Sequence, residues 1–286
     1  MWIAEETVQR LDRPETRQEL ARVATKAARA ASGEAIEILW DGMWMRKAEG
    51  VYFPDPDIFR TANPPWDRWC HMAAKYLRDA EDYWFHIYQP KHGDVIVDIG
   101  AGRGEDVYAF SQVVGPTGHV WAIEAHPTSY TILSRFCELN ALSNVTALNM
   151  ACVDTPTTLH IETLPVWESN FVRGGGATAT SHEIDGLQFD ALASEQGIDH
   201  IDFLKMNIEG AERSALPGCV EALKRTSHVC VAAHDFRAAR GEGEDFRTLT
   251  FVREFLSELG FRLETRDDDP RYYVPYLVHG YRAAKD

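Results

Sequence analysis

Apolar residues along this chain fall into short, nearly continuous runs that polar turns separate. A run too apolar to alternate is typical of a strand buried on both faces of a parallel sheet. Such runs lie at Val95–Ile99, Gly118–Glu124, Asn144–Met150, Phe203–Ile208 and Val229–Ala233. Segments with helical spacing lie between several of them, so the pattern predicts an α/β fold built on a mostly parallel sheet.

The last part of the chain departs from this pattern. An amphipathic helix is expected over Phe246–Leu259, followed by strands over Arg262–Arg266 and Tyr276–Tyr281 around an acidic turn at Pro270. Two consecutive strands joined by a short connection pair in antiparallel fashion. The sheet is therefore expected to end in a C-terminal antiparallel hairpin.

The beginning of the chain predicts a helix followed by a small hairpin. Pro14–Ala31 has a proline in the first turn and Gly33 after its end, which is typical of a helix. Asp41-Gly42 is a strong signal for a hairpin, and a two-residue turn there would pair Trp40 with Met43.

Residues 1–90 are expected to form this N-terminal extension on the substrate side, and residues 91–286 the main domain. Near the end of the extension, aromatic residues recur at helical spacing through Trp66–Tyr88 and predict one long helix. Two interpretations stay open for it. The helix packs on the sheet, or its aromatic side chains form a wall over the site of a second ligand.

Composition narrows the classes of function. The chain has 286 residues, 45% of them hydrophobic, and a formal net charge of −15. That charge argues against non-specific binding to nucleic acid or to an anionic membrane, both of which need a basic face. The five cysteines form no C-x-x-C pair, so we expect reduced thiols and no zinc site. With no signal-peptide pattern, the expected location is the cytoplasm.

The most informative motif follows the first buried strand. Gly100, Gly102 and Gly104 alternate after Asp98 and predict a tight turn that opens a helix. Helix-start amides then face a ligand above the loop. Dinucleotide-binding loops place their third glycine one residue later, and acidic Glu105 would repel a pyrophosphate. The motif D-I-G-A-G-x-G resembles the first motif of the S-adenosylmethionine-dependent methyltransferases, whose cofactor carries no phosphate.

Glu124 ends the next strand, about twenty residues beyond the loop. An acidic residue at this position binds the ribose hydroxyls of a nucleoside cofactor in related α/β folds; the alternative is a helix cap. Ala151 and Cys152 follow the third strand at the same edge of the sheet. The expected cofactor contacts are Asp98, Gly100, Ala101, Gly102, Gly104, Glu105, Glu124, Ala125, Ala151, Cys152 and Asn207.

A second motif surrounds the fourth strand and identifies a narrower family. The segment I-D-F-L-K-M-N-I-E-G-A-E resembles the signature of the FkbM-type methyltransferases, D-x-L-K-x-D-x-E-G-x-E. The matching residues are Asp202, Leu204, Lys205, Glu209, Gly210 and Glu212, while Asn207 replaces the usual Asp. The resemblance implies a Rossmann-like class I methyltransferase sheet, the cofactor S-adenosylmethionine and methyl transfer to a hydroxyl of a small molecule, a sugar or a natural product.

The expected catalytic residues are His234, Glu209 and Asn207, all placed where strands end. His234 is the best candidate for the base that takes the hydroxyl proton, since its ordinary pKa lies near 6.5. Glu209 is a base, an orienting group or a partner of the cofactor amine. Lys205, inside its strand, is expected to pair with an acidic group such as Glu209 or Glu212. No essential metal is expected.

Two other functions stay open at this point. One is an NAD-type oxidoreductase, and the other is a catalytically inactive methyltransferase fold that serves as a binding module. The polar, glycine-rich stretch Leu164–His182 is either a solvated connection or a lid over the site. A homo-oligomer is possible.

Overall fold

The computed structural model describes residues 3–59, 65–162, 172–173 and 181–282. Most of the segment expected as a lid, 164–182, lies outside these residues. The chain divides into two compact units. One comprises Met1–Arg78 with Ser134–Leu142, and the other comprises Asp79–Leu133 with Ser143–Asp286.

The first unit contains a three-stranded sheet and an amphipathic helix that packs on it. Its sheet has the order β1-β2-β3, with both pairs antiparallel. Leu20, Ala24 and Ala28 of α2 are fully buried. The elements at this end of the chain are α1 (Glu5–Leu11), α2 (Arg17–Ser32), β1 (Glu37–Trp40), β2 (Trp44–Ala48), β3 (Val51–Pro54), α3 (Trp66–Trp69) and α4 (Met72–Asp79).

Two local predictions for this region were wrong in detail. The hairpin pairs Trp40 with Trp44 instead of Met43, because the turn spans three residues and only Gly42 among them has a positive φ, of 69°. The long aromatic helix is interrupted: α3 and α4 are separate, and the chain continues as a π-helix, η1 (Ala80–Trp84). A π-helix depends on tertiary contacts that helical spacing does not report.

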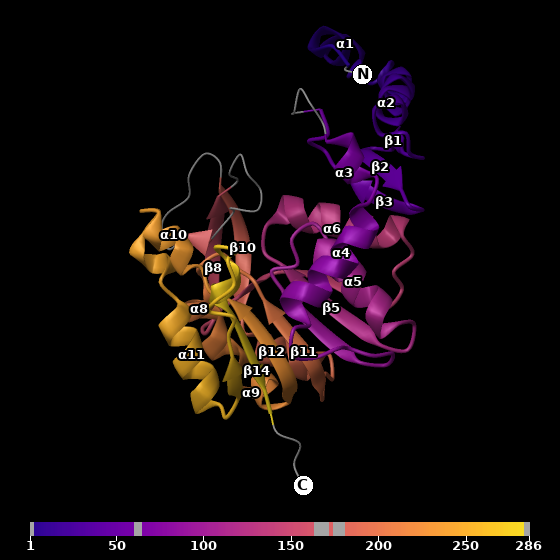
Figure 1. Ribbon diagram of the computed structural model, residues 1–286. Coiled ribbons are helices and arrows are strands. Elements are labelled where there is room, and N and C mark those ends of the chain that lie inside the picture. The colour runs from indigo at the N-terminus through magenta and orange to yellow at the C-terminus, as the bar shows by residue number, and fades with distance from the viewer. Residues whose placement is uncertain (1–2, 60–64, 163–171, 174–180, 283–286) are drawn as a thin grey trace. The chain divides into compact units, whose positions relative to one another are not determined.

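The second unit contains a seven-stranded sheet in the order β13-β14-β12-β11-β4-β5-β6 (Figure 1). All neighbouring strands are parallel except β14, which runs antiparallel to β12 and β13. The predicted α/β sheet with an antiparallel C-terminal hairpin is confirmed. Its strands are β4 (Val95–Ile99), β5 (His119–Glu124), β6 (Val145–Asn149), β11 (Ile201–Met206), β12 (Thr226–Ala232), β13 (Arg262–Glu264) and β14 (Leu277–Tyr281).

Helices pack on this sheet and bury its apolar side chains. α5 contacts β4 and β5, while α11 contacts β13 and β14. Val97, Leu204 and Val229 of the central strands and Leu256 of α11 are fully buried. The helices are α5 (Glu105–Val114), α6 (Pro127–Leu139), α7 (Phe189–Glu195), α8 (Glu212–Ala215), α9 (Val220–Lys224), α10 (Asp235–Ala239) and α11 (Leu249–Glu258), with the 3₁₀ turns η3 (Leu216–Cys219), η4 (Glu244–Phe246) and η5 (Val274–Tyr276).

A second, smaller sheet is inserted after β6. Its order is β7-β10-β8-β9, and β8 comprises Thr157–Glu162. The other strands are β7 (Ala151–Cys152), β9 (Val172–Arg173) and β10 (Ser181–Leu187). Across the described part of the chain, no helix combines the length and the apolar character that crossing a bilayer requires.

Candidate active site

The candidate site lies where the order of the strands reverses. β4 is followed along the chain by β5 on one side, whereas its other neighbour, β11, comes much later. Ligands of open α/β sheets bind at this switch point, outside the carboxyl ends of the strands. The glycine loop follows β4 and Glu124 ends β5, so these predicted cofactor residues share one half of the edge, whereas Asn207, also expected to contact the cofactor, does not. Asn207, Glu209 and His234 follow β11 and β12 and share the other half.

Backbone hydrogen bonds fold the glycine loop into a tight turn. The amides of Gly100 and Ala101 both donate to the carbonyl of Ile123, at 2.9 and 3.0 Å. Gly100 has a φ of 84°, and a Cβ there would lie 2.0 Å from the carbonyl oxygen of Asn207. This glycine is therefore required by the neighbouring backbone of the β11 end. Glu105, the first residue of α5, directly follows Gly104, which has a φ of 104°.

A buried lysine holds the base of this loop. Lys205 Nζ lies 2.8 Å from Asp98 Oδ1 and 3.4 Å from Asp106 Oδ2, and it donates to the carbonyl of Gly100 at 2.9 Å. Burial opposes the charged ammonium, but the two carboxylates outweigh it and hold the pKa of Lys205 above its ordinary value. The prediction that buried Lys205 pairs with an acidic group is confirmed, but the partners are Asp98 and Asp106 and not Glu209 or Glu212. Lys205 instead ties β11 to β4 and orients the loop.

The carboxylate of Glu124 is fixed beside the loop. Its Oε2 accepts the amide of Gly102 at 2.8 Å, and its Oε1 accepts the amide of His126 at 2.7 Å. Each oxygen accepts one of these amides and has a further lone pair for a second donor. Burial raises the pKa of Glu124 to about 7, although both backbone amides oppose the rise. The carboxylate is thus oriented and able to accept hydroxyl donors.

The remaining predicted cofactor residues lie at the adjoining strand ends. The side-chain amide of Asn149 donates to the carbonyls of Glu124 and Ala125, at 2.8 and 3.0 Å. Ala151 and Cys152 form β7 and are buried. The five cysteines, all within the described residues, are free thiols. In the part of the chain that the structure describes, no group of three or more His, Cys, Asp or Glu could hold a metal ion.

The other half of the edge contains a row of two carboxylates with an imidazole between them. His234 Nε2 lies 3.2 Å from Glu209 Oε1, and His234 Nδ1 lies 3.0 Å from Glu212 Oε1. Glu209 has a φ of 55°, uncommon for a residue with a side chain. Non-glycine residues held in this region cluster at functional sites.

Both ring nitrogens of His234 are engaged, and the side chain is 3% exposed. Burial opposes the charged ring, but the hydrogen bonds to Glu209 and Glu212 outweigh it and raise the pKa of His234 to about 10. The ordinary value near 6.5, on which the sequence prediction of a base relied, therefore does not apply. At neutral pH this residue is an imidazolium ion.

The sequence did not predict two contacts of this row, the pairing of Glu212 with His234 and that of Arg237 with Glu209. Glu212 belongs to the signature motif, but nothing in the motif indicates a histidine partner. Arg237 donates to Glu209 at 2.7 Å and to Glu242 at 2.7 Å. Burial favours the neutral acid of Glu209, but His234 and Arg237 outweigh it and lower the pKa of Glu209. Arg237 is one turn beyond His234, and no sequence pattern marks it.

Comparison with known proteins identifies the family. Residues 98–263, more than half of the chain, match the model described as the methyltransferase FkbM domain. The chain belongs to the FkbM methyltransferase family. Members of this family depend on S-adenosylmethionine, so the predicted family, cofactor and class I methyltransferase sheet are confirmed. The oxidoreductase interpretation is thereby excluded.

Individual relatives are distant. The methyltransferase sdnD of Sordaria araneosa is 29% identical over 175 residues, which are 49% of this chain and 66% of that protein. The crystal structure of an FkbM methyltransferase from Methylobacillus flagellatus has 16% identity, covers 74% of this chain and 53% of its own, and gives a TM-score of 0.48. Fibrillarin of Aeropyrum pernix, crystallised with bound S-adenosyl-L-methionine, has 12% identity, coverages of 84% and 82%, and a TM-score of 0.42. The chain spans about half of the solved FkbM relative and just under two thirds of sdnD.

Proposed function

We propose that this FkbM-family chain transfers the methyl group of S-adenosylmethionine to a hydroxyl of a small molecule, a sugar or a natural product. The observation that carries the proposal is the row Glu209–His234–Glu212 at the carboxyl edge, on the half that the glycine loop and Glu124 leave free. Methyl transfer to an alcohol needs a group that takes a proton, and this row supplies one.

The cofactor half of the edge fits a nucleoside-containing sulfonium. Glu124 would accept the ribose hydroxyls, since its carboxylate is already oriented by Gly102 and His126. Asp98 acts indirectly, by holding Lys205 against the loop. When bound, the cofactor supplies an electrophilic methyl group. No phosphate group has to be accommodated near Glu105 and Asp106.

The charges of the row explain how the chain would accept the proton. Two carboxylates and one imidazolium carry one net negative charge, while Arg237 and Glu242 compensate each other. Glu209 is the outermost member, with its side chain 23% exposed against 3% for His234 and 0% for Glu212. We assign the first proton transfer to Glu209. His234 keeps Glu209 in place and shares the charge with Glu212.

Asn207 would orient the acceptor or the cofactor by hydrogen bonds, since an amide takes no proton at neutral pH. Its backbone amide donates to the carbonyl of Ile99 at 2.9 Å, which fixes this segment against the β4 end. Amide and adenine N-methyltransferases commonly have N-P-P-Y here. This chain has Asn207-Ile-Glu-Gly instead, which favours a hydroxyl acceptor.

Methyl-¹³C-labelled S-adenosylmethionine tests the proposal directly. The protein is incubated with it and with a panel of hydroxylated glycosides, phenols and polyketides. Carbon NMR of the product separates O-methyl from N-methyl groups. An O-methylated product that the Glu209→Gln variant forms at least about a hundredfold more slowly is expected. N-methylated products alone would contradict the proposal. Cofactor binding without transfer to any acceptor would support the inactive binding module.

A further inference from the structure

An aromatic platform lies next to the proton-accepting row. Phe236, on α10, has its ring centroid 5.6 Å from that of His234. Tyr272 and Tyr276 pack against the same phenyl ring, at 5.4 and 5.7 Å between centroids. Tyr272 is 58% exposed, the highest value among the exposed large hydrophobic residues of the described chain. We call Phe236, Tyr272 and Tyr276 the platform.

The platform belongs to the acceptor half of the sheet edge. α10 follows the carboxyl end of β12, and β14, antiparallel to β12, begins there with Leu277 opposite Ala232. The segment that leads into β14 therefore reaches the same edge as His234. Apart from Asn207, the expected cofactor contacts follow β4, β5 and β6 on the other side of the switch point, so they do not compete for this surface.

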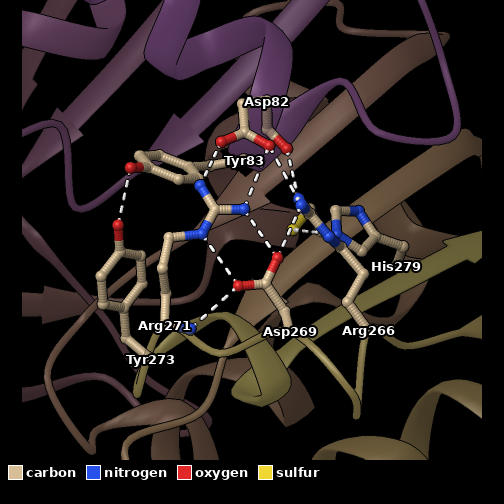
Figure 2. A network of polar contacts seen from close by, with 8 residues as sticks. Asp82, Tyr83, Arg266, Asp269, Arg271, Tyr273 and His279 are labelled. Atoms are coloured by element: carbon tan, nitrogen blue, oxygen red, sulfur yellow. Dashed lines mark hydrogen bonds and ion pairs between the residues drawn. The ribbon is translucent and has the colours of Figure 1, made fainter.

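A network of ion pairs holds the segment that carries Tyr272. Arg266 and Arg271 lie between the carboxylates of Asp82 and Asp269 (Figure 2). On the other side of Tyr272, the hydroxyl of Tyr273 donates to that of Tyr83 at 2.6 Å. Asp82 and Tyr83 belong to the π-helix η1, an element that is frequent at functional sites. An exposed ring held in this way presents a fixed surface to a ligand, as binding sites require.

One cation, Arg240, lies on the platform. The guanidinium of Arg240 is 4.5 Å from the ring centroid of Tyr272 and 5.4 Å from that of Phe236. Within the described residues no carboxylate lies within 4.0 Å of it, the limit for an ion pair. The neighbouring charged side chains have other partners. Arg237 pairs with Glu209 and Glu242, and Asp235 accepts the amides of Thr248 and Leu249.

We infer that this surface binds an acceptor whose ring carries a carboxylate group close to the hydroxyl that is methylated. The ring would pack on Tyr272 and Phe236, and the carboxylate would pair with Arg240. A guanidinium binds a carboxylate through two parallel hydrogen bonds, which also fixes its orientation. The chain as a whole has a net charge of −15 and repels anions, so a local cation has to supply the attraction.

The inference rests on the proposed function, and its test separates the two. The probes are a matched pair, p-nitrophenyl β-glucuronide and p-nitrophenyl β-glucoside, which differ by the carboxylate. Each is titrated by calorimetry into the protein saturated with S-adenosylhomocysteine. We expect the glucuronide to bind at least about tenfold more tightly than the glucoside, with an advantage that falls as salt is added.

Variants assign the effect to residues. Arg240→Gln should abolish the preference for the glucuronide, and Tyr272→Ala should weaken both probes alike. Arg262→Gln is the control. It removes one exposed positive charge from the start of β13, opposite Tyr281 at the far end of β14, and should change neither affinity.

The outcomes distinguish the two proposals. Equal binding of the two probes, no binding of either at millimolar concentration, or an unchanged preference in Arg240→Gln would overturn the inference. In each of these cases normal binding of S-adenosylhomocysteine would leave the proposed function standing. Failure of S-adenosylhomocysteine itself to bind would count against the proposed function instead.

Discussion

At the scale of single residues, His234 shows how far neighbours change the chemistry of a side chain. As an isolated histidine it is a base for neutral pH. Between Glu209 and Glu212 it is held in its charged form, and its pKa rises to about 10. It therefore stabilises two carboxylates, and its proton is already in place before any acceptor binds.

This raised pKa predicts a pH-dependent contribution to stability. The pKa of His234 is about 6.5 in the unfolded chain and about 10 in the folded protein. Its stabilisation is thus complete below about pH 6.5 and is lost as the pH rises through about 10. The free energy of unfolding of the wild type should exceed that of His234→Gln most at about pH 6. The difference should shrink steadily towards pH 10.

Urea unfolding of both proteins across this range measures the difference. Because the two proteins share every other titrating group, the comparison cancels most of their contributions. A gap that stays constant from pH 6 to pH 10 would mean that His234 is not held charged by the two glutamates.

Which residues the sequence could place depended on how far apart their partners lie along the chain. The glycine loop, Glu124 and the signature around β11 are local patterns, and all were predicted at the carboxyl edge. The partner of Lys205 was not, because Asp98 and Asp106 are about a hundred residues away and are brought to it only by β4 pairing with β11. The Glu212–His234 pair was missed for a related reason, since its members follow β11 and β12 and meet only because these two strands pair.

At the scale of elements, the junction of β4 and β11 is the most constrained part of the site. The Cβ of any residue at position 100 would lie 2.0 Å from the carbonyl oxygen of Asn207. Lys205 of β11 also joins these two strands, through its ion pair with Asp98 of β4 and its hydrogen bond to the carbonyl of Gly100. Sequence reasoning attributed all three glycines to a tight turn below a ligand, and their positive φ values agree with the turn. For Gly100 the closer cause is the neighbouring strand end.

A matched pair of glycine substitutions tests this constraint. Gly100 and Gly197 both have positive φ, of 84° and 66°, but nothing lies within 4 Å of a Cβ at Gly197. Gly197→Ala should cost only the conformational penalty of about 1–2 kcal/mol. Gly100→Ala should lower the free energy of unfolding by clearly more, since backbone has to move. Equal losses in chemical denaturation would refute the close contact.

The sequence predicted the wrong structure where tertiary contacts determine the conformation of the element. Helical spacing continues through Trp66–Tyr88, yet the chain changes to a π-helix at Ala80–Trp84. Asp82 and Tyr83 of this π-helix bind Arg271 and Tyr273, which lie about 190 residues further along the chain. The strands of the seven-stranded sheet, by contrast, were predicted from short apolar runs. Such runs can be recognised without knowing the tertiary contacts, and the predicted positions were close to the observed ones.

At the scale of the whole molecule, the chain combines an FkbM methyltransferase sheet with residues outside the family model. The match begins at residue 98 and ends at residue 263, so the first 97 residues and the strand β14 lie beyond it. β14 nevertheless completes the sheet and brings Tyr276 to its carboxyl edge. Of the acceptor-side residues, Tyr272 and Tyr276 therefore lie beyond the match, whereas Phe236 and Arg240 lie within it.

We also predict whether turnover by the whole protein requires a metal ion. Asn207 stands where the family signature has Asp, and an amide is a weaker ligand than a carboxylate for a hard cation. We expect turnover with any accepted hydroxyl substrate to be the same in EDTA as in magnesium. Loss of activity in EDTA that magnesium restores would instead assign a metal to Asn207 and Glu209.

The central claim is that the carboxyl edge of β4 and β5 binds the cofactor through Glu124. Calorimetric titration of S-adenosylhomocysteine into the wild type and Glu124→Ala tests it most directly. Each hydrogen bond to a charged carboxylate is worth about 1.5–3 kcal/mol, so the variant should bind at least about tenfold more weakly with an unchanged circular dichroism spectrum. Equal affinity of the two folded proteins would contradict the account.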